Sequence, residues 1–372
     1  MDFDDTPEEA AFRAEARAWL TEHAVPKGHP DDFSRSFFDP DSDWDELVVR
    51  CTTWQRTLFD GGWAGISYPV EHGGRGGTLV EELIFAEEMD RFGVTNGAFM
   101  IAHTMVGPAI LAFGTDEQKR RHIEPMLRGD EVWCQLFSEP GAGSDLANLS
   151  TRAVLDGDEW VIDGQKVWTS NSTWAHHGIL LARTAPELPR HRGITYFLVD
   201  MSTPGIEIRP LRQMTGESHF SEVFFTDVRI PAGQVLGGSD RINDGWRAAM
   251  HTLSNERASI GTAPTSLDTE GLLALAEAHG RVDDPVVRDE LAAAIIRTRI
   301  VGYLGLRVQT AIRQGREPGP ESSVVKLFFT EHVKRVGSLA LELEGACQGP
   351  VLVRPSGSGR CATPGRGFMR RR

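Results

Sequence analysis

The sequence has few cysteines, an excess of acidic over basic residues and no long apolar run. Only four cysteines occur in 372 residues, and none forms a CxxC pair or has metal-ligand spacing, which disfavours disulfide and zinc sites. No apolar stretch reaches the roughly eighteen residues of a membrane-spanning helix, so we do not expect membrane insertion. The formal net charge of −14 argues against binding nucleic acid or an anionic membrane, because both require a basic surface.

The length and hydrophobic content predict a globular protein. A chain of 372 residues is long enough for two or three domains, and a hydrophobic content of 40% can fill sizeable cores. The first residues, MDFDDTPEEAAFRAEA, are acidic and amphipathic and do not resemble a signal peptide. We therefore expect a soluble, cytoplasmic protein with buried free thiols at Cys51, Cys134, Cys347 and Cys361. A local basic pocket for phosphate groups is still compatible with the acidic total.

Three patterns follow one another along the chain and predict an α+β fold. Residues 1–132 mainly have a helical period, although glycine and proline interrupt it between residues 63 and 77. We expect Thr115 to cap a helix within this first domain. Residues 133–240 hold short runs rich in β-branched and aromatic residues, including TYFLVDM, IEIRPL and EVFFTDVRIP, which predict a β-sheet domain. Residues 241–346 return to the helical period.

The end of the chain differs in composition from the rest. Residues 347–372 contain six arginines and no acidic residue, whereas all 53 acidic residues precede them. Proline and glycine interrupt this segment throughout, so it does not form an amphipathic helix. We expect a disordered tail produced by an out-of-frame or truncated end of the coding region.

The most informative stretch runs from residue 133 to residue 171. It contains the glycine-rich loop SEPGAGSD, in which Pro140, Gly141 and Gly143 are expected to force a turn that other residues would resist. Ser144 and Asp145 place short polar groups beside exposed N–H donors, which suits an anionic or carbonyl-rich ligand. An ordinary hairpin loop is the alternative interpretation of this segment.

The second half of the stretch predicts three short strands. Asp156, Gly157 and Asp158 form a tight-turn signal between TRAVL and EWVIDG, two runs rich in β-branched and aromatic residues. GQKVWTSN follows as a third run. The local expectation is a β meander in which Ser138 and Ser170 lie on neighbouring strands.

The helix that begins near Gly245 carries a charged pair close to an apolar stripe. At about 100° per residue, the stripe consists of Trp246, Met250, Leu253 and Ile260. Arg257 falls in the middle of this stripe and Glu256 at its edge. A buried guanidinium needs a partner, so Arg257 either ties helices together through an acidic residue or holds a substrate. In the second case Glu256 faces the same cavity, and partial removal from water would raise the pKa of its carboxyl toward the range that proton abstraction requires.

SEPGAGSD followed by GDEWVIDGQKVWTSN resembles the signature of the acyl-CoA dehydrogenase family, and the resemblance extends over almost the whole chain. It implies an N-terminal helical domain, a middle β domain and a C-terminal helical bundle, which is incomplete here. It also implies FAD as cofactor and an acyl-CoA as substrate. The residues that match cofactor-binding positions are Gln135, Phe137, Ser138, Gly143, Ser144, Trp168 and Ser170. Arg288 is the remaining candidate for a pyrophosphate partner, and an exposed charge on a helix is the alternative interpretation. Ser144, Ser254 and Arg257 match substrate-binding positions.

The resemblance also implies which residue is the catalytic base. Most family members carry the catalytic glutamate near the C-terminus, ahead of a Gly-Thr pair that this sequence lacks. SNERASIG is similar to the arrangement of isovaleryl- and long-chain-type members, so Glu256 is the candidate base. Glu256 would remove the α-proton of the thioester while the β-hydrogen leaves as hydride to flavin N5, giving a 2,3-enoyl-CoA.

The resemblance leaves other functions and partners open. An electron-transfer flavoprotein-type acceptor is implied, as is a homotetramer or a heterotetramer with a homologue. A bacterial subgroup that acts on bulky or steroid side-chain esters looks similar, so the pathway is fatty acid or steroid side-chain degradation. The chain is alternatively an inactive or partner subunit, or a flavin monooxygenase or nitroalkane-oxidase-like member of the fold.

Metal and hydrolase chemistry have little support in the sequence. The spacings of His103, His176, His177 and His219 give no HxxxH pair on a helix, and no set of carboxylates accompanies them. A GxSxG elbow, which a Ser-His-Asp hydrolase of the α/β type would need, is absent from the sequence. We therefore predict no metal site.

Overall fold

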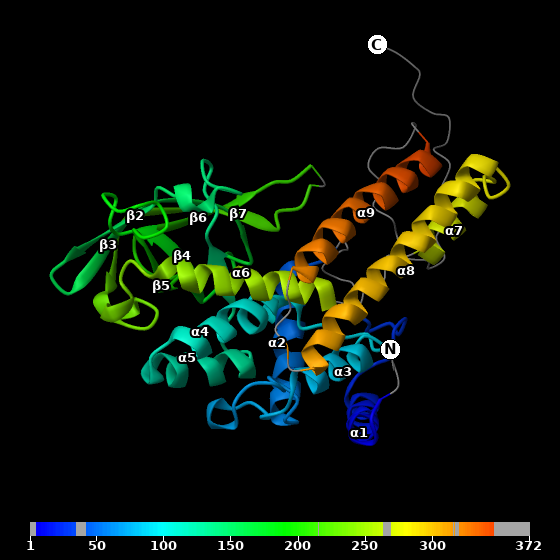
Figure 1. Ribbon diagram of the computed structural model, residues 1–372, viewed down its shortest axis with the longest axis horizontal. Helices are drawn as coiled ribbons and strands as arrows, with labels where there is room; N and C mark the ends of the chain where they lie inside the picture. The colour runs from blue at the N-terminus through cyan, green and yellow to red at the C-terminus, as the bar shows by residue number, and fades with distance from the viewer. Residues whose placement is uncertain are drawn as a thin grey trace, which may run out of the picture. The chain divides into compact units, whose positions relative to one another are not determined.

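The computed structural model describes residues 5–34, 42–214, 216–262, 269–314, 316 and 320–345. Helices, then strands, then helices follow one another along these residues, which confirms the α+β fold class (Figure 1). The predicted tail, residues 347–372, lies outside the described residues. The chain divides into two compact units: Met1–Pro264 with Leu304–Lys326, and Thr265–Tyr303 with Leu327–Arg372.

The first unit begins with helices. They are α1 (Pro7–His23), α2 (Trp44–Asp60), α3 (Leu79–Met89), α4 (Gly107–Phe113) and α5 (Asp116–Arg128), with short helical turns at Val70–His72 (η2), Gly97–Phe99 (η3) and Ala102–Val106 (η4). Thr115 caps α5 as predicted: its hydroxyl accepts a hydrogen bond from the amide of Gln118, and the Gln118 side chain accepts one from the amide of Thr115. Within residues 63–77 the short turn η2 is the helical element, in agreement with the glycine-rich sequence there.

The strands form one seven-stranded sheet. Its order is β1-β4-β2-β3-β7-β6, with β5 paired to β4 outside this path. The strands are β1 (Trp133–Leu136), β2 (Arg152–Asp156), β3 (Glu159–Ser170), β4 (His177–Arg183), β5 (Ile194–Asp200), β6 (Ile206–Leu211) and β7 (Phe220–Pro231). The last three correspond to the runs TYFLVDM, IEIRPL and EVFFTDVRIP, so these three predicted strands are confirmed.

The predicted three-stranded meander is wrong in one respect. β2 and β3 do form a hairpin around the tight turn, with Asp156 paired to Glu159. EWVIDG and GQKVWTS, however, belong to the single strand β3, which continues past Gly164 through an irregularity in its pairing with β7. Gly164 therefore does not end a strand. It allows a close approach instead, because a Cβ there would stand 2.5 Å from Oγ1 of Thr151.

β4 and β5 are buried on both faces. In β5, Tyr196 and Leu198 belong to the core shared with the N-terminal helices, whereas Phe197 and Val199 belong to a second core within the curled sheet. Alternate residues of a strand point to opposite faces, so β5 is in contact with both layers. This explains why the run from Ile194 to Val199 is apolar or buried at every position and does not alternate with polar residues.

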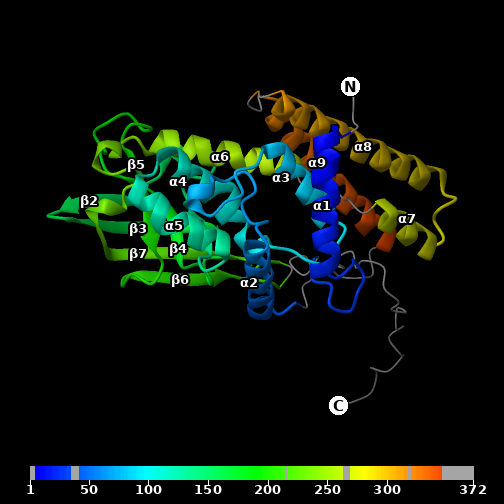
Figure 2. The ribbon, with the colours of Figure 1, turned by 90° about the horizontal axis from the view of Figure 1, so that it is seen from below.

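The helix α6 (Gly245–Thr262) packs against β5 and also contacts α4 and η4 (Figures 1 and 2). Its first residue meets the strand very closely, because a Cβ on Gly245 would stand 2.5 Å from the backbone nitrogen of Tyr196 and 2.6 Å from the carbonyl carbon of Thr195. Near the middle of the helix, the hydroxyls of Tyr196 and Thr252 are 3.1 Å apart and hydrogen-bonded. Glycine at the start of α6 and a hydroxyl pair further along thus fix the helix on the strand.

The second unit is helical. It contains α7 (Thr269–Ala278), the first part of α8 (Pro285–Arg313) and the later part of α9 (Glu321–Glu344). Its own core consists of Leu272, Ala276, Val287, Leu291, Ala294, Leu339, Ala340 and Leu343. α7, α8 and α9 lie within residues 241–346, where the sequence returns to a helical period.

Two expectations drawn from composition concern thiols and membranes. Cys51 and Cys134 are buried free thiols as expected, whereas Cys347 and Cys361 lie outside the described residues. None of the described helices is both long and apolar enough to cross a membrane.

Candidate active site

The glycine-rich loop after β1 is closed by its backbone. The amide of Glu139 donates to the carbonyl of Ala142, and the amide of Ala142 donates to the carbonyl of Glu139, both at 3.0 Å. The expectation that Gly141 and Gly143 force this turn is wrong, because neither has a positive φ. A Cβ at either glycine would meet no atom within 4 Å. The glycines therefore leave open space above the loop, where exposed Ser144 also lies.

Below the loop, a carboxylate and an ammonium form a buried ion pair. Oε1 of Glu139 lies 2.8 Å from Nζ of Lys166, and the two residues are 5% and 0% exposed. Glu139 also accepts hydrogen bonds from the amides of Ser150 and Thr151. Burial alone would raise the pKa of Glu139, but the Lys166 charge and these hydrogen bonds lower it to about 2. Burial lowers the pKa of Lys166 against the opposing effect of Glu139.

Trp168 is presented to solvent by an irregularity in β3. The pairing with β7 shifts register between Lys166 and Thr169, which is typical of a β-bulge. Trp168 lies in this bulge with a φ of 60°, a left-handed conformation that is costly for a side-chain-bearing residue. Its side chain is 62% exposed and meets the ring of Phe220 edge-on at 5.9 Å. A large aromatic ring held outward at such a backbone cost indicates a platform for a ligand.

The residues around Trp168 fit a planar cofactor with polar groups. Oγ1 of Thr169 is buried and has no hydrogen-bond partner among the described atoms. Ser138 and Ser170 are both half-buried, and the amide of Val167 donates to the carbonyl of Ser138 at 2.9 Å. The ends of β1 and β3 are therefore joined here, although β1 pairs with β4 in the sheet. An exposed ring beside an open loop suits the flavin that the sequence implies.

Phe137 connects this region to α6. It is buried, and its ring meets that of Tyr196 edge-on at 5.8 Å. The Tyr196 hydroxyl in turn contacts Thr252 on α6. Gln135, two residues earlier on β1, is half-buried and pairs with Ile179. Phe137, Tyr196 and Thr252 thus form a chain of contacts from the end of β1, across β5, to the helix that carries Glu256.

The buried face of α6 differs from the predicted one. Its fully buried members are Gly245, Ala248, Ala249 and Thr252, whereas Trp246, Met250 and Leu253 are only half-buried. At about 100° per residue, Glu256 continues the line of Gly245, Ala249 and Thr252, and Arg257 continues the half-buried line. The placement of Arg257 at the centre of the buried face is therefore wrong, and Glu256 takes that position. Both side chains are half-buried, Ser254 is exposed, and the side chain of Ile260 lies outside the described residues.

A basic loop lies beside Ser144. The connection between β4 and β5 carries Arg190, His191 and Arg192, all of them exposed. Arg190 pairs with Asp145 at 3.1 Å, and the His191 ring lies 5.6 Å from that of Trp246 at the start of α6. The loop carries two arginines and one glutamate, Glu187, in a chain whose net charge is −14.

Arg288 lies on α8 in the second unit. Its side chain is 67% exposed and its nearest acidic partner is Asp283, 3.9 Å away. Its interpretation as a pyrophosphate partner stays a prediction, as does the whole set of site residues that the resemblance implies.

The histidines form a cluster that the sequence did not indicate. Among the described residues, His122, Glu131 and His177 bring their ligand atoms within 4.8 Å of one another. Glu131 accepts from both histidines and from Arg121, and these partners lower the pKa of its carboxyl against the effect of burial. A carboxylate with three donors, one of them a guanidinium, is already satisfied without a metal ion.

The other three histidines of the metal hypothesis are dispersed. His103 is half-buried against the carbonyl of Met126, and burial lowers its pKa to about 4. His176 accepts a hydrogen bond from the amide of Val132, and His219 pairs with Glu217.

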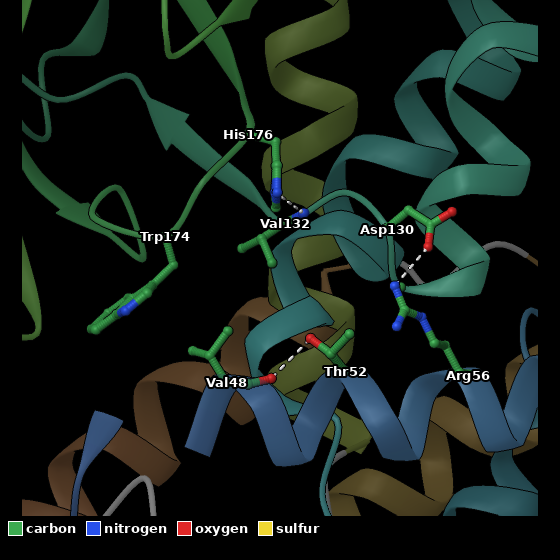
Figure 3. Close-up of a pocket in the computed structure, with 8 residues that line it drawn as sticks. Val48, Thr52, Arg56, Asp130, Val132, Trp174 and His176 are labelled. Atoms are coloured by element: carbon green, nitrogen blue, oxygen red, sulfur yellow. Dashed lines mark hydrogen bonds and ion pairs between the residues drawn. The ribbon is translucent and has the colours of Figure 1, made fainter. Parts of the chain in front are cut away.

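A surface hollow lies between α2 and the residues just before β1 and β4. It measures about 510 Å³ and is lined by Val48, Thr52, Arg56, Gly129, Asp130, Val132, Trp174 and His176 (Figure 3). Arg56 faces Asp130 across it at 3.2 Å. None of the predicted site residues lines this hollow, so the candidate site rests on the loop, β3 and α6.

Two charged residues of the site were missed from the sequence. Glu139 and Lys166 occur in the two motifs that were noticed, yet neither was considered as a functional residue. The sequence did contain a signal for Lys166. Trp160, Ile162 and Lys166 are an even number of residues apart and so lie on the same face of β3, and a lysine on a buried face needs a partner for its charge.

Comparisons with known protein families cover most of the chain. The model of the acyl-CoA dehydrogenase N-terminal domain matches residues 6–130, that of the middle domain residues 134–228, and that of the C-terminal domain residues 243–347. Acyl-CoA dehydrogenase IpdE1 of Mycolicibacterium smegmatis is 36% identical over 350 residues, which cover 90% of this chain and 86% of the relative.

Solved structures give the same result. The Tcur3481-Tcur3483 steroid ACAD superposes with a TM-score of 0.75 at 31% identity, covering 93% of this chain and 87% of the other. The ChsE4-ChsE5 complex from Mycobacterium tuberculosis superposes with a TM-score of 0.70 at 28% identity, covering 93% and 86%.

Proposed function

The chain belongs to the acyl-CoA dehydrogenase family, and we propose that it converts an acyl-CoA thioester to the 2,3-enoyl-CoA with Glu256 as the base. The observation that carries this proposal is the position of Glu256 on α6. It continues the face that packs on β5, and β5 contacts Phe137 of the loop strand. On the helical wheel Glu256 follows Thr252 by one turn on this face, which supports its proposed role as base.

The proposed chemistry needs two groups that act together. The α-proton of a thioester is weakly acidic, so Glu256 requires a polarised thioester carbonyl as enolate charge develops. FAD, when bound, supplies the acceptor for the hydride that leaves the β-carbon. Glu256 would hold the abstracted proton on its carboxylate until product leaves.

The residues that would hold FAD surround the open loop. Trp168 would offer a face for the ring, with hydroxyls from Ser138 and Ser170 at its edge, Gln135 on β1 and Phe137 directly after this strand. Gly143 and Ser144 would let the cofactor approach the loop backbone, because nothing lies above the glycine. Arg288 remains the proposed pyrophosphate partner.

The thioester would enter between the loop and α6. Ser144 and Arg257 would hold the CoA moiety, with Ser254 at the exposed edge of the helix. The basic loop between β4 and β5 supports this arrangement, since CoA carries several phosphate charges and the rest of the chain is acidic. We infer that Arg190 and Arg192 attract these phosphates.

Removing the two arginines of the basic loop should weaken substrate binding. We expect Arg190→Ala/Arg192→Ala to raise KM for an acyl-CoA about tenfold with kcat within about twofold, because the lost contacts lie far from the reacting carbons. Steady-state kinetics at low and high salt measure this, and the difference should shrink at high salt. The matched control is Arg152→Ala/Arg229→Ala, which removes two exposed arginines elsewhere on the sheet, one at the start of β2 and one on β7. An unchanged KM in the first variant contradicts the inference.

The acyl group is proposed to be large and polycyclic. One of the similar structures is a steroid ACAD, and the relative IpdE1 aligns over most of this chain. We therefore propose CoA esters of steroid side chains as substrates, with an electron-transfer flavoprotein as the electron acceptor.

We also propose that the chain works in an oligomer, either with itself or with a second chain of the same family. Two of the similar structures are pairs of different chains. Within the second unit, α8 exposes large apolar side chains that suit an interface: Val286, Ile295, Ile296 and Tyr303.

Anaerobic titration tests the proposed function. Purified protein, alone or co-expressed with a second family member from the same organism, should bind FAD and lose its flavin absorbance when a substrate is added. A panel of short, long, branched and steroid acyl-CoA esters should show the steroid esters to be the best. Native mass spectrometry of the coloured sample should show a tetramer. Protein that remains colourless with FAD in both preparations, or that no ester bleaches, defeats the proposal.

A further inference from the structure

Three contacts join the two motifs at the base of the candidate site. Nζ of Lys166 donates to Oε1 of Glu139 at 2.8 Å and to the carbonyl of Phe137 at 3.1 Å. The amide of Val167 donates to the carbonyl of Ser138. The segment before the loop is thus tied to β3 at the two residues that precede Trp168.

The contacts coincide with backbone strain. Trp168 has a φ of 60°, and it lies where β3 shifts register against β7, directly after Lys166. A non-glycine residue keeps such a conformation only if the surrounding structure holds it there. Trp168 does not hold itself by burial, because its side chain is mostly exposed. The holding contacts must therefore come from its neighbours in the strand.

Lys166 is the neighbour that is held most firmly. It is completely buried, and its charge is matched by Glu139, whose carboxylate is itself held by Ser150 and Thr151. Removing either charge would leave the other one buried without a partner, so neither side chain can leave its place separately. Lys166 consequently fixes the inward side of β3 just before the bulge.

We propose that the Glu139–Lys166 ion pair positions Trp168, by holding β3 in the bulge that turns this ring outward over the loop. The pair thereby holds the glycine-rich loop SEPGAGSD and the end of β3, QKVWTSN, in a fixed arrangement. Its effect on FAD rests on the proposed function, whereas its effect on the Trp168 backbone does not.

The direct test removes both charges together. Glu139→Gln/Lys166→Met leaves no unpaired buried charge, so the double variant should fold and should melt at a higher temperature than Lys166→Met alone. With 5-fluorotryptophan incorporated, the ¹⁹F resonance of Trp168 can be assigned by its loss in Trp168→Phe. In FAD-free protein this resonance should shift and broaden in the double variant, because the ring then samples several positions. The Kd for FAD should rise about tenfold or more.

A matched control lies on the same sheet. Arg152 pairs with Asp163 across β2 and β3, but this pair is largely exposed, so Arg152→Met should leave the Trp168 resonance and the Kd for FAD unchanged. If the double variant does not fold, Glu139→Asp replaces it, since the shorter side chain keeps the charge but draws it away from Lys166. An unaltered Trp168 resonance in the folded variant overturns the proposal. If the wild type binds no FAD, the proposed function fails while the resonance still decides this inference.

Discussion

Glu256→Gln is expected to bind FAD and acyl-CoA like the wild type and to reduce the flavin about 10³-fold more slowly. An amide keeps the size and most hydrogen bonds of the carboxylate but cannot accept the α-proton. The loss should therefore fall on the chemical step, with KM little changed. Anaerobic stopped-flow mixing with excess substrate measures the reduction rate directly.

A matched control makes this result specific to Glu256. Glu277→Gln makes the same change at an exposed position on α7 and should react like the wild type. Reduction within a few-fold of the wild-type rate would show that another residue is the base.

Gly245→Ala should cause a large loss of stability. The new Cβ would stand 2.5 Å from the nitrogen of Tyr196, and a backbone atom of a strand buried on both faces cannot give way. α6 must then move away from β5, which we expect to cost about 3 kcal/mol of unfolding free energy. Urea denaturation measures the loss. Because the same movement displaces Glu256, the reduction rate should fall as well.

A second glycine supplies the control. Gly302 lies in α8, and a Cβ there would meet no atom within 4 Å. Gly302→Ala should therefore stabilise the protein by up to about 1 kcal/mol, as alanine does in an exposed helix interior. If Gly245→Ala is as stable as the wild type, the close approach of α6 to β5 does not control the position of the helix.

The sequence was sufficient for the parts of the fold that depend on local pattern. The order of helices and strands and the Thr115 cap follow from periodicity and from short-range hydrogen bonding, and the structure confirms them. The break at Gly164 was misjudged because a glycine can mark a close approach as well as a turn. Only the position of Thr151 across the sheet distinguishes the two, and that is a long-range fact.

The site was less predictable for the same reason. A helical wheel gives relative angles along α6, but the direction of the core depends on how the helix packs. The prediction centred the buried face of α6 on Arg257 because the large apolar residues Trp246 and Met250 lie on that side. In the structure the small residues Gly245 and Ala249 are the more deeply buried ones. The outward direction of the Trp168 side chain also depends on a shift in the pairing of β3 with β7. The sequence of β3 alone does not predict this shift.

The burial of β5 on both faces has a consequence for how far a single substitution can be felt. Tyr196 on this strand contacts the ring of Phe137 with its own ring and the hydroxyl of Thr252 on α6 with its hydroxyl. A change at Tyr196 would therefore disturb the segment after β1 and the helix α6 together, although these two parts of the chain are more than a hundred residues apart in the sequence.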